Sequence, residues 1–121
     1  MGSTNTINTS MATNFSSVDC QTSIQQIEQI FGSSTVQVLP VTENGQFSGV
    51  IHRSDFIDYA MNDERLGSTA KEMMTYNYIK LAINNSVADA KEYLQMGCFP
   101  IIPIVDDHNF LVGIISQEMV A

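Results

Sequence analysis

The chain has 121 residues, of which 44% are apolar and 15% charged, and this composition excludes an intrinsically disordered protein. Thirteen acidic against five basic residues give a formal net charge of −8. That balance argues against nucleic acid as the main partner, because phosphate backbones are held by clustered cations. No apolar run approaches the roughly 20 residues that cross a bilayer, and no signal-peptide pattern is present. We therefore expect an acidic, globular, cytoplasmic protein without membrane insertion.

The two ends of the chain differ from its body. Residues 1–10 are polar and show no periodicity, which predicts a mobile tail. Met1, Gly2 and Ser3 look like a remnant of cloning, and this interpretation is favoured over the myristoylation pattern that Gly2 and Thr6 also fit. Residues 117–119 read as the first turn of a helix that has been cut short. We therefore expect a fragment of a longer protein.

Two cysteines, Cys20 and Cys98, form no CxxC motif and no Cys/His cluster. Two thiols in a chain of this length do not make a disulfide scaffold. We expect two reduced thiols, with a disulfide between them as the less favoured alternative.

An internal repeat organises the chain. Four pairs of identical residues lie 63 positions apart: Met11 and Met74, Asn14 and Asn77, Ser23 and Ser86, Pro40 and Pro103. The second copy then carries one additional residue, so that Gly49 matches Gly113. The pattern predicts a tail at 1–10, a first repeat at 11–62, a linker at 63–72 and a second repeat at 73–121.

The first copy begins with a short extended segment at residues 15–18. A helix follows, capped by Thr22 or Ser23 with Gln25 or Gln26 in the third position of a capping box, and Gly32 is its expected stop. Its apolar side chains recur at helical spacing, which predicts core positions at Ile24, Ile27, Ile30 and Phe31. Strands at 36–41 and 47–51 flank Asn44-Gly45, a strong hairpin signal. A second helix begins near Ser54, and a polar linker covers residues 62–70.

The second copy follows the same order. An extended segment at 78–82 precedes a helix that is capped by Asn85 or Ser86 and stopped by Gly97. Its buried stripe consists of Val87, Ala90 and Leu94. The strands at 101–105 and 110–115 are nearly continuous in apolar residues, which is typical of strands covered on both faces. Each copy is thus a β-α-β-β-α unit, too small to bury enough apolar surface alone. We expect an α+β fold in which two such units pack sheet to sheet.

Four strings recur in this order at nearly constant spacing, namely Leu39-Pro40-Val41, residues 49–55, residues 102–105 and residues 113–116. Over residues 11–121 the arrangement resembles the tandem cystathionine-β-synthase (CBS) domain pair. The resemblance implies a pseudo-twofold regulatory module that performs no catalysis and requires no cofactor. It implies an adenosine-containing ligand (AMP, ADP, ATP or S-adenosylmethionine) in the cleft between the repeats. It also implies a homodimer, and control of an attached or partner enzyme or transporter.

The ligand signature of the family is Gly, two apolar residues, Thr or Ser, two variable residues and Asp. The first copy keeps Gly49 and Asp55 but has His52 in the hydroxyl position. The second copy keeps Gly113 and Ser116 but has a methionine in place of the aspartate. Because an ionised Asp can accept hydrogen bonds from both ribose hydroxyls, we expect the better site around Asp55.

The resemblance carries two sets of residues over to this chain. The main site comprises Ile51, His52, Arg53, Asp55, Ile79, Lys80 and Ile101, with Ile79 and Ile101 on either side of the adenine and Arg53, Lys80 and a protonated His52 suited to a phosphate. A second, weaker site comprises Ser16, Val38 and Ser116. Neither set includes a metal ligand or a catalytic residue.

Each of these residues also has a plain structural interpretation. Asp55 near a helix start stabilises the first turn through the helix dipole. Arg53 and Lys80 are alternatively surface cations, and His52 a buried or rim histidine. His108, in a hairpin loop, is expected to be exposed to solvent.

Three functions compete at this point. A ligand sensor is the first, and the net charge predicts that AMP, adenosine or S-adenosylmethionine binds better than ATP. The incomplete signatures favour a ligand-free dimerisation module as the alternative. An enzyme using His52 and Asp55 as an acid–base pair is least favoured, because the sequence has no Gly-rich phosphate loop, nucleophile elbow or metal-spaced set.

Overall fold

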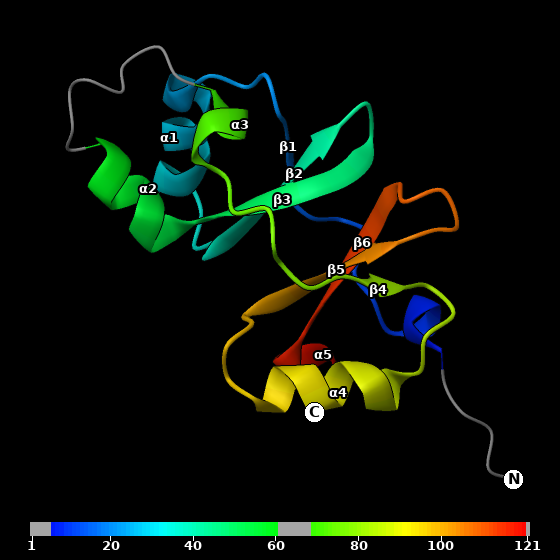
Figure 1. Ribbon diagram of the computed structural model, residues 1–121. Coiled ribbons are helices and arrows are strands. Elements are labelled where there is room, and N and C mark those ends of the chain that lie inside the picture. The colour runs from blue at the N-terminus through cyan, green and yellow to red at the C-terminus, as the bar shows by residue number, and fades with distance from the viewer. Residues whose placement is uncertain (1–5, 61–68, 121) are drawn as a thin grey trace, which may run out of the picture. The chain divides into compact units, whose positions relative to one another are not determined.

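The computed structural model of the protein describes residues 6–60 and 69–120. These residues fall into two compact units (Figure 1). One is the continuous stretch Ser16–Tyr78, and the other combines Met1–Phe15 with Ile79–Ala121. The expectations for residues 1–5 and most of the linker at 62–70 fall outside the described part of the chain.

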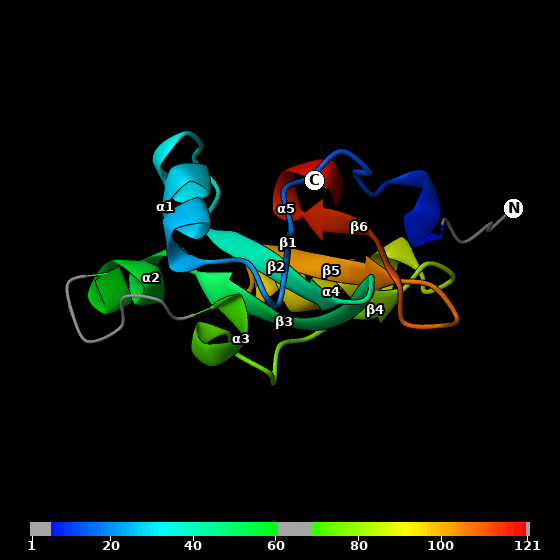
Figure 2. The ribbon, with the colours of Figure 1, turned by 90° about the horizontal axis from the view of Figure 1, so that it is seen from above.

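The unit Ser16–Tyr78 contains a three-stranded sheet in the order β1-β2-β3. Strand β1 runs parallel to β2, and β2 and β3 form an antiparallel hairpin (Figure 2). The expected strand at 15–18 is found two to three residues later, and the strand expected at 36–41 begins at Val38. The elements are β1 (Val18–Asp19), α1 (Ile24–Gly32), β2 (Val38–Glu43), β3 (Gln46–His52), α2 (Arg53–Ala60) and α3 (Ala70–Met73).

The other unit repeats this arrangement with a sheet in the order β4-β5-β6. Strand β5 has the expected bounds, whereas the extended segment at 78–82 contributes only its last two residues to β4. The elements are the 3₁₀ helix η1 (Ile7–Thr9), β4 (Leu81–Ala82), α4 (Val87–Gln95), β5 (Ile101–Val105), β6 (Leu111–Ser116) and α5 (Gln117–Val120). The predicted fold, two β-α-β-β-α repeats, is confirmed.

The helices begin and end where local chemistry predicts. Ser23 is the N-cap of α1, and its hydroxyl accepts from the backbone N–H of Gln26 at 3.3 Å. Ser86 caps α4 in a complete capping box, in which Ser86 and Asp89 each accept from the backbone N–H of the other. Gly97 follows the end of α4 with φ +77°, a conformation that glycine adopts without strain.

The two hairpins use different turn chemistry. Asn44 and Gly45 both have positive φ, 55° and 85°, which is the geometry of a two-residue type I′ turn. In the β5–β6 loop, Asp106 Oδ1 accepts from two backbone N–H groups and Asn109 has φ 68°. His108 lies exposed in this loop, as predicted.

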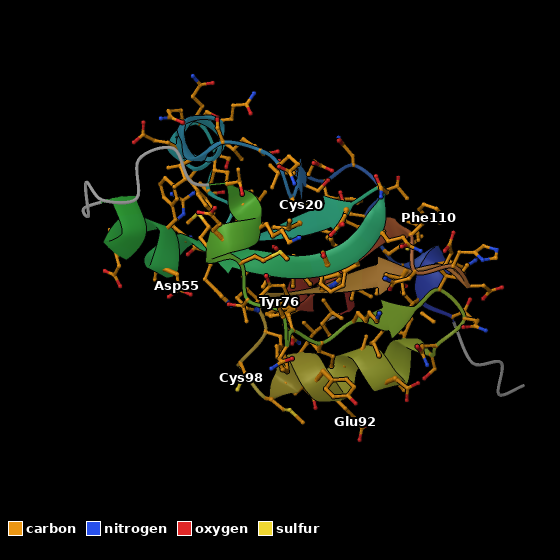
Figure 3. The ribbon with its side chains drawn as sticks, turned by 45° about the horizontal axis from the view of Figure 1, so that its top comes forward. Cys20, Asp55, Tyr76, Glu92, Cys98 and Phe110 are labelled. Atoms are coloured by element: carbon orange, nitrogen blue, oxygen red, sulfur yellow. The ribbon has the colours of Figure 1, made fainter. Side chains whose placement is uncertain are left out.

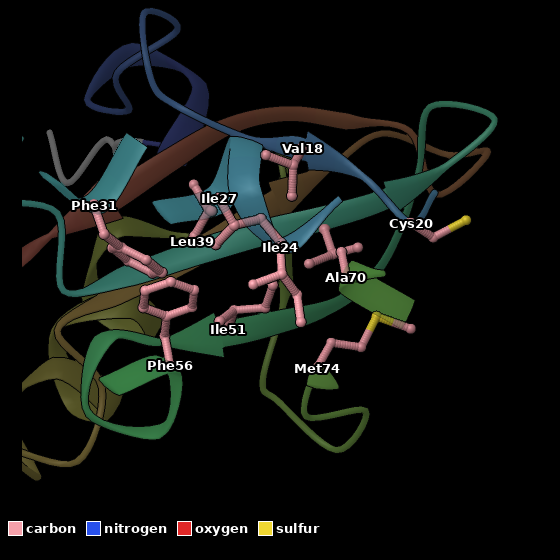
Figure 4. Close-up of a cluster of buried hydrophobic side chains, with 11 residues drawn as sticks. Val18, Cys20, Ile24, Ile27, Phe31, Leu39, Ile51, Phe56, Ala70 and Met74 are labelled. Carbon is pink, nitrogen blue, oxygen red and sulfur yellow. The ribbon is translucent and has the colours of Figure 1, made fainter. Parts of the chain in front are cut away.

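Each unit has its own apolar core. In the unit Ser16–Tyr78, α1 and α2 pack on the sheet, and the rings of Phe31 and Phe56 lie 5.2 Å apart (Figure 4). The predicted core residues Ile24 and Ile27 are buried there. The other core contains Ala90, Leu94, Ile102, Ile104, Ile115 and Ile7. Both cysteines are free, with Cys20 buried and Cys98 exposed.

Ile7 overturns the expectation of a mobile tail for residues 7–10. Its side chain is fully buried, and its backbone N–H donates to the carbonyl of Asn85 at 2.9 Å. The tail expectation rested on the polar composition of residues 1–10 and overlooked the one isoleucine that can be buried. These residues are therefore an ordered part of the unit that contains β4–β6.

A segment from outside the strands pairs with the free edge of each hairpin. Thr75 exchanges two backbone hydrogen bonds with Val50 of β3, at 3.0 and 2.7 Å. Ala12 exchanges two with Ile114 of β6, at 2.9 and 3.0 Å. We call residues 11–12 and 74–75 the edge segments. Contacts thus group residues 11–15 with the second repeat, while the repeat boundaries at 11–62 and 73–121 stay a prediction about the sequence.

Candidate functional site

The junction between β3 and α2 holds three of the predicted site residues. His52 is the last residue of β3, Arg53 is the first residue of α2, and Asp55 lies in the first turn of that helix. Val38, from the weaker predicted set, pairs with His52 across the β2–β3 ladder. The unit Ser16–Tyr78 therefore brings these four residues to one end of its sheet.

Asp55 presents an accessible carboxylate. Its side chain is exposed on α2 (Figure 3), and among the described residues no group donates a hydrogen bond to it. A carboxylate in the first helical turn interacts favourably with the helix dipole. The structure therefore accommodates both interpretations of Asp55, as a helix-stabilising acid and as a free acceptor.

His52 lies against an aromatic ring that the sequence analysis missed. Its imidazole centroid is 5.6 Å from that of Tyr78, with the ring planes tilted by 58°. Ile51, directly before it, is buried in the core that contains Ile24 and Phe56, with 1% of its surface exposed. Tyr78 gave no sequence signal, because it belongs to an irregular segment without periodicity.

Arg53 makes a set of contacts with the loop that follows α1. Its Nε donates to the carbonyl of Val36 at 2.8 Å, and its Nη2 donates to the carbonyl of Ser34 at 2.7 Å. The guanidinium carbon also lies 5.0 Å from the centre of the Phe31 ring, within cation–π range. Arg53 is therefore not a freely solvated surface cation.

The equivalent strand end in the other unit carries Ser116. It is the last residue of β6, pairs with Ile101 across the ladder, and is 7% exposed. Its Oγ is buried without a hydrogen-bond partner among the described residues. Met119 occupies the position of the family's aspartate on α5 and is 37% exposed.

The remaining predicted residues have simpler surroundings. Lys80 is exposed and donates to Asn109 Oδ1 at 2.6 Å. Ile79 packs against the core around Ile102, and Ser16 lies exposed before β1. The combination of these residues with Asp55 into one binding site stays a prediction.

Two further properties of the described residues bear on function. Residues 6–60 and 69–120 contain no group of three or more His, Cys, Asp or Glu side chains that could hold a metal ion. Within the same part of the chain, no helix has the length and apolar character needed to cross a membrane.

The family of the chain follows from a model comparison. The CBS domain model matches residues 6–62 and again residues 70–121. The chain belongs to the CBS domain family. The two matches correspond to the two repeats predicted from the sequence, so this chain is a CBS pair.

Relatives of this CBS pair are distant in sequence. It is 27% identical over 94 residues to the uncharacterized protein MJ1232 of Methanocaldococcus jannaschii, an alignment that covers 78% of this chain and 31% of the relative. The CBS pair thus spans about a third of the length of this curated relative.

Solved structures share its fold. CBSX2, a CBS-pair protein from Arabidopsis thaliana solved in complex with AMP, superposes with a TM-score of 0.83 at 23% identity, covering 96% of this chain and 93% of that one. The CBS domain pair of protein MJ0100, in complex with 5-methylthioadenosine and S-adenosylmethionine, gives a TM-score of 0.77 at 21% identity, covering 98% and 94%. At these identities the likeness establishes the fold alone.

Proposed function

We propose that this CBS pair is a non-catalytic regulatory module that binds an adenosine-containing ligand and controls an attached or partner enzyme or transporter. CBSX2 was solved with AMP, and the MJ0100 pair with 5-methylthioadenosine and S-adenosylmethionine. Adenosine is the part that these ligands share. In this proposal the protein is a cytoplasmic homodimer.

The buried hydroxyl of Ser116 is the observation that carries the proposal. A buried polar atom without a partner costs about 1–3 kcal/mol, so a native structure rarely leaves one without a reason. Ser116 stands in the hydroxyl position of the family signature, at the end of β6. A phosphate or ribose oxygen would supply the missing hydrogen bond.

Asp55 is the second anchor in the proposal. Its carboxylate is exposed and accepts no hydrogen bond from the described residues, so its acceptor capacity is available to a ligand. An ionised carboxylate accepts two hydroxyl donors at once, which suits the 2′ and 3′ hydroxyls of a ribose. Ile79, Lys80 and Ile101 complete the proposed set as predicted from the resemblance.

Charge sets the proposed order of ligands. The net charge of −8 repels a triphosphate more strongly than a monophosphate, although salt confines this effect to about 8 Å at physiological ionic strength. We therefore rank adenosine, AMP and the sulfonium-bearing S-adenosylmethionine above ATP. Tightest binding by ATP in calorimetric titrations of all four compounds would contradict this ranking.

Thermal denaturation with these four compounds tests the proposal as a whole. A ligand at 100 times its Kd stabilises the folded state by about 2.7 kcal/mol, which raises Tm by several degrees. Asp55→Asn should abolish this rise, whereas Asp58→Asn, an exposed acid on the same helix, should leave it intact. Ser116→Ala should weaken binding while leaving the unliganded protein equally or more stable, because it removes an unsatisfied hydroxyl.

A ligand-free dimerisation module is the second candidate. His52 and Met119 in two positions of the family signature favour it. This candidate predicts a dimer in sedimentation and no change of Tm with any of the four compounds. That pair of results would refute the sensor.

A further inference from the structure

Arg53 connects the start of α2 to the loop at residues 33–37. Its backbone N–H donates to the carbonyl of Gln37 at 2.8 Å, in addition to the side-chain bonds to Val36 and Ser34. Three consecutive contacts along one loop therefore come from one residue. Among the described residues no carboxylate pairs with the guanidinium, so neutral carbonyls and the Phe31 ring surround the charge.

The same loop is fixed to α1 on its other side. Ser33 Oγ donates to the carbonyl of Gln29 at 2.8 Å, and Ser34 Oγ donates to that of Ile30 at 2.7 Å. These serines satisfy carbonyls at the C-terminal end of the helix, which have no partner within it. The loop is thus held at both ends, and Arg53 is its attachment to α2.

The geometry leaves the guanidinium little freedom to move toward a ligand. Nε has a single N–H, and that proton is committed to Val36. The planar guanidinium is also fixed by its second bond and by Phe31, which itself packs against Phe56 of α2. An Arg held by a fork of two carbonyls sets the direction of the chain around it.

We infer that Arg53 is a positioning residue, which holds the first turn of α2 so that Asp55, two residues later, meets the ligand. This inference rests on the proposed function. It differs from the sequence-based expectation that Arg53 contacts a phosphate. A phosphate contact would matter only for AMP, whereas a positioning role affects every ligand that Asp55 holds.

Calorimetric titration with adenosine and with AMP separates these roles, because the two compounds differ by the phosphate alone. Arg53→Met should weaken both by the same factor, about tenfold, which is the lower end of the loss seen when an orienting partner is removed at metal sites. Arg53→Lys, which keeps one donor group and the charge, should weaken both less. Lys91→Met, an exposed site on α4 with the same change of charge, should alter neither. All titrations are run well below the Tm of each variant.

Other outcomes overturn the inference in distinguishable ways. Weakening of AMP alone would assign Arg53 to the phosphate. A lower Tm with unchanged affinities would make Arg53 a purely structural residue. If the unaltered protein binds neither compound, the proposed function fails. Amide hydrogen exchange then still tests the tether, because Arg53→Met should accelerate exchange of the Arg53 backbone N–H and unchanged exchange would refute it.

Discussion

Gly49 and Gly113 occupy equivalent positions beside the two edge segments, and they predict unequal costs for the same substitution. A Cβ on Gly49 would lie 2.5 Å from the backbone oxygen of Thr75 and 3.1 Å from Met74 Sδ. A Cβ on Gly113 would lie 2.5 Å from Met11 Sδ and 3.0 Å from the backbone oxygen of Ala12. The closest atom is thus backbone in the first case and the end of a flexible side chain in the second.

The magnitude for Gly49→Ala follows from what must move. Displacing residues 74–75 breaks two backbone hydrogen bonds to Val50, each worth about 0.5–1.5 kcal/mol. It also exposes part of buried Met74, whose full burial is worth about 1.5–3 kcal/mol. We expect a loss of about 3 kcal/mol for Gly49→Ala. We expect about 1 kcal/mol for Gly113→Ala, because the Met11 thioether can rotate away.

Urea unfolding followed by circular dichroism measures both variants against the unaltered protein. A common m-value would show that the change lies in stability rather than in the compactness of the states. Thermal melts should show a fall in Tm of about 10 °C for Gly49→Ala and a few degrees for Gly113→Ala. Equal losses, or a larger loss at Gly113, would show that the edge segments do not hold their sheets as described.

Three further predictions follow from local contacts. Ser86→Ala should cost about 1 kcal/mol in urea unfolding, because it removes a complete capping box, and more than Ser23→Ala, which loses a single bond of 3.3 Å; the reverse order would contradict the cap geometry. Ile7→Ala should cost about 2–5 kcal/mol because the side chain is fully buried, and a neutral result would restore the tail interpretation. A thiol reagent should modify exposed Cys98 rapidly and buried Cys20 only on unfolding; equal rates in the folded protein would refute this difference.

Short-range signals explain why so much of each repeat was predictable. Asn44-Gly45 fixes a hairpin because both residues adopt positive φ. Ser86 marks a helix start because its hydroxyl satisfies an N–H within the same turn. The bounds of β5 were predicted because five apolar residues stand between a proline-containing loop and two aspartates.

Long-range contacts explain what was missed. The repeat shows that Met11 and Met74 are equivalent, but not which sheet the following residues pair with, because a single bridge leaves no pattern in the sequence. The bonds from Arg53 to the loop after α1 are side chain to carbonyl, and carbonyls are the same at every residue. The unpartnered state of Ser116 Oγ likewise depends on burial, which the signature alone does not give.

The placement of residues 6–15 with β4–β6 bears on how the chain folds during synthesis. The stretch Ser16–Tyr78 is continuous, so all of its strands leave the ribosome together and its sheet can close early. The other unit has to wait, because its first segment is made before residue 16 and its partner strand β6 comes near residue 116. Domains generally fold as units in the order of their synthesis. Here the middle of the chain would fold first, while Ile7 and residues 11–12 stay unpaired until the last strand arrives.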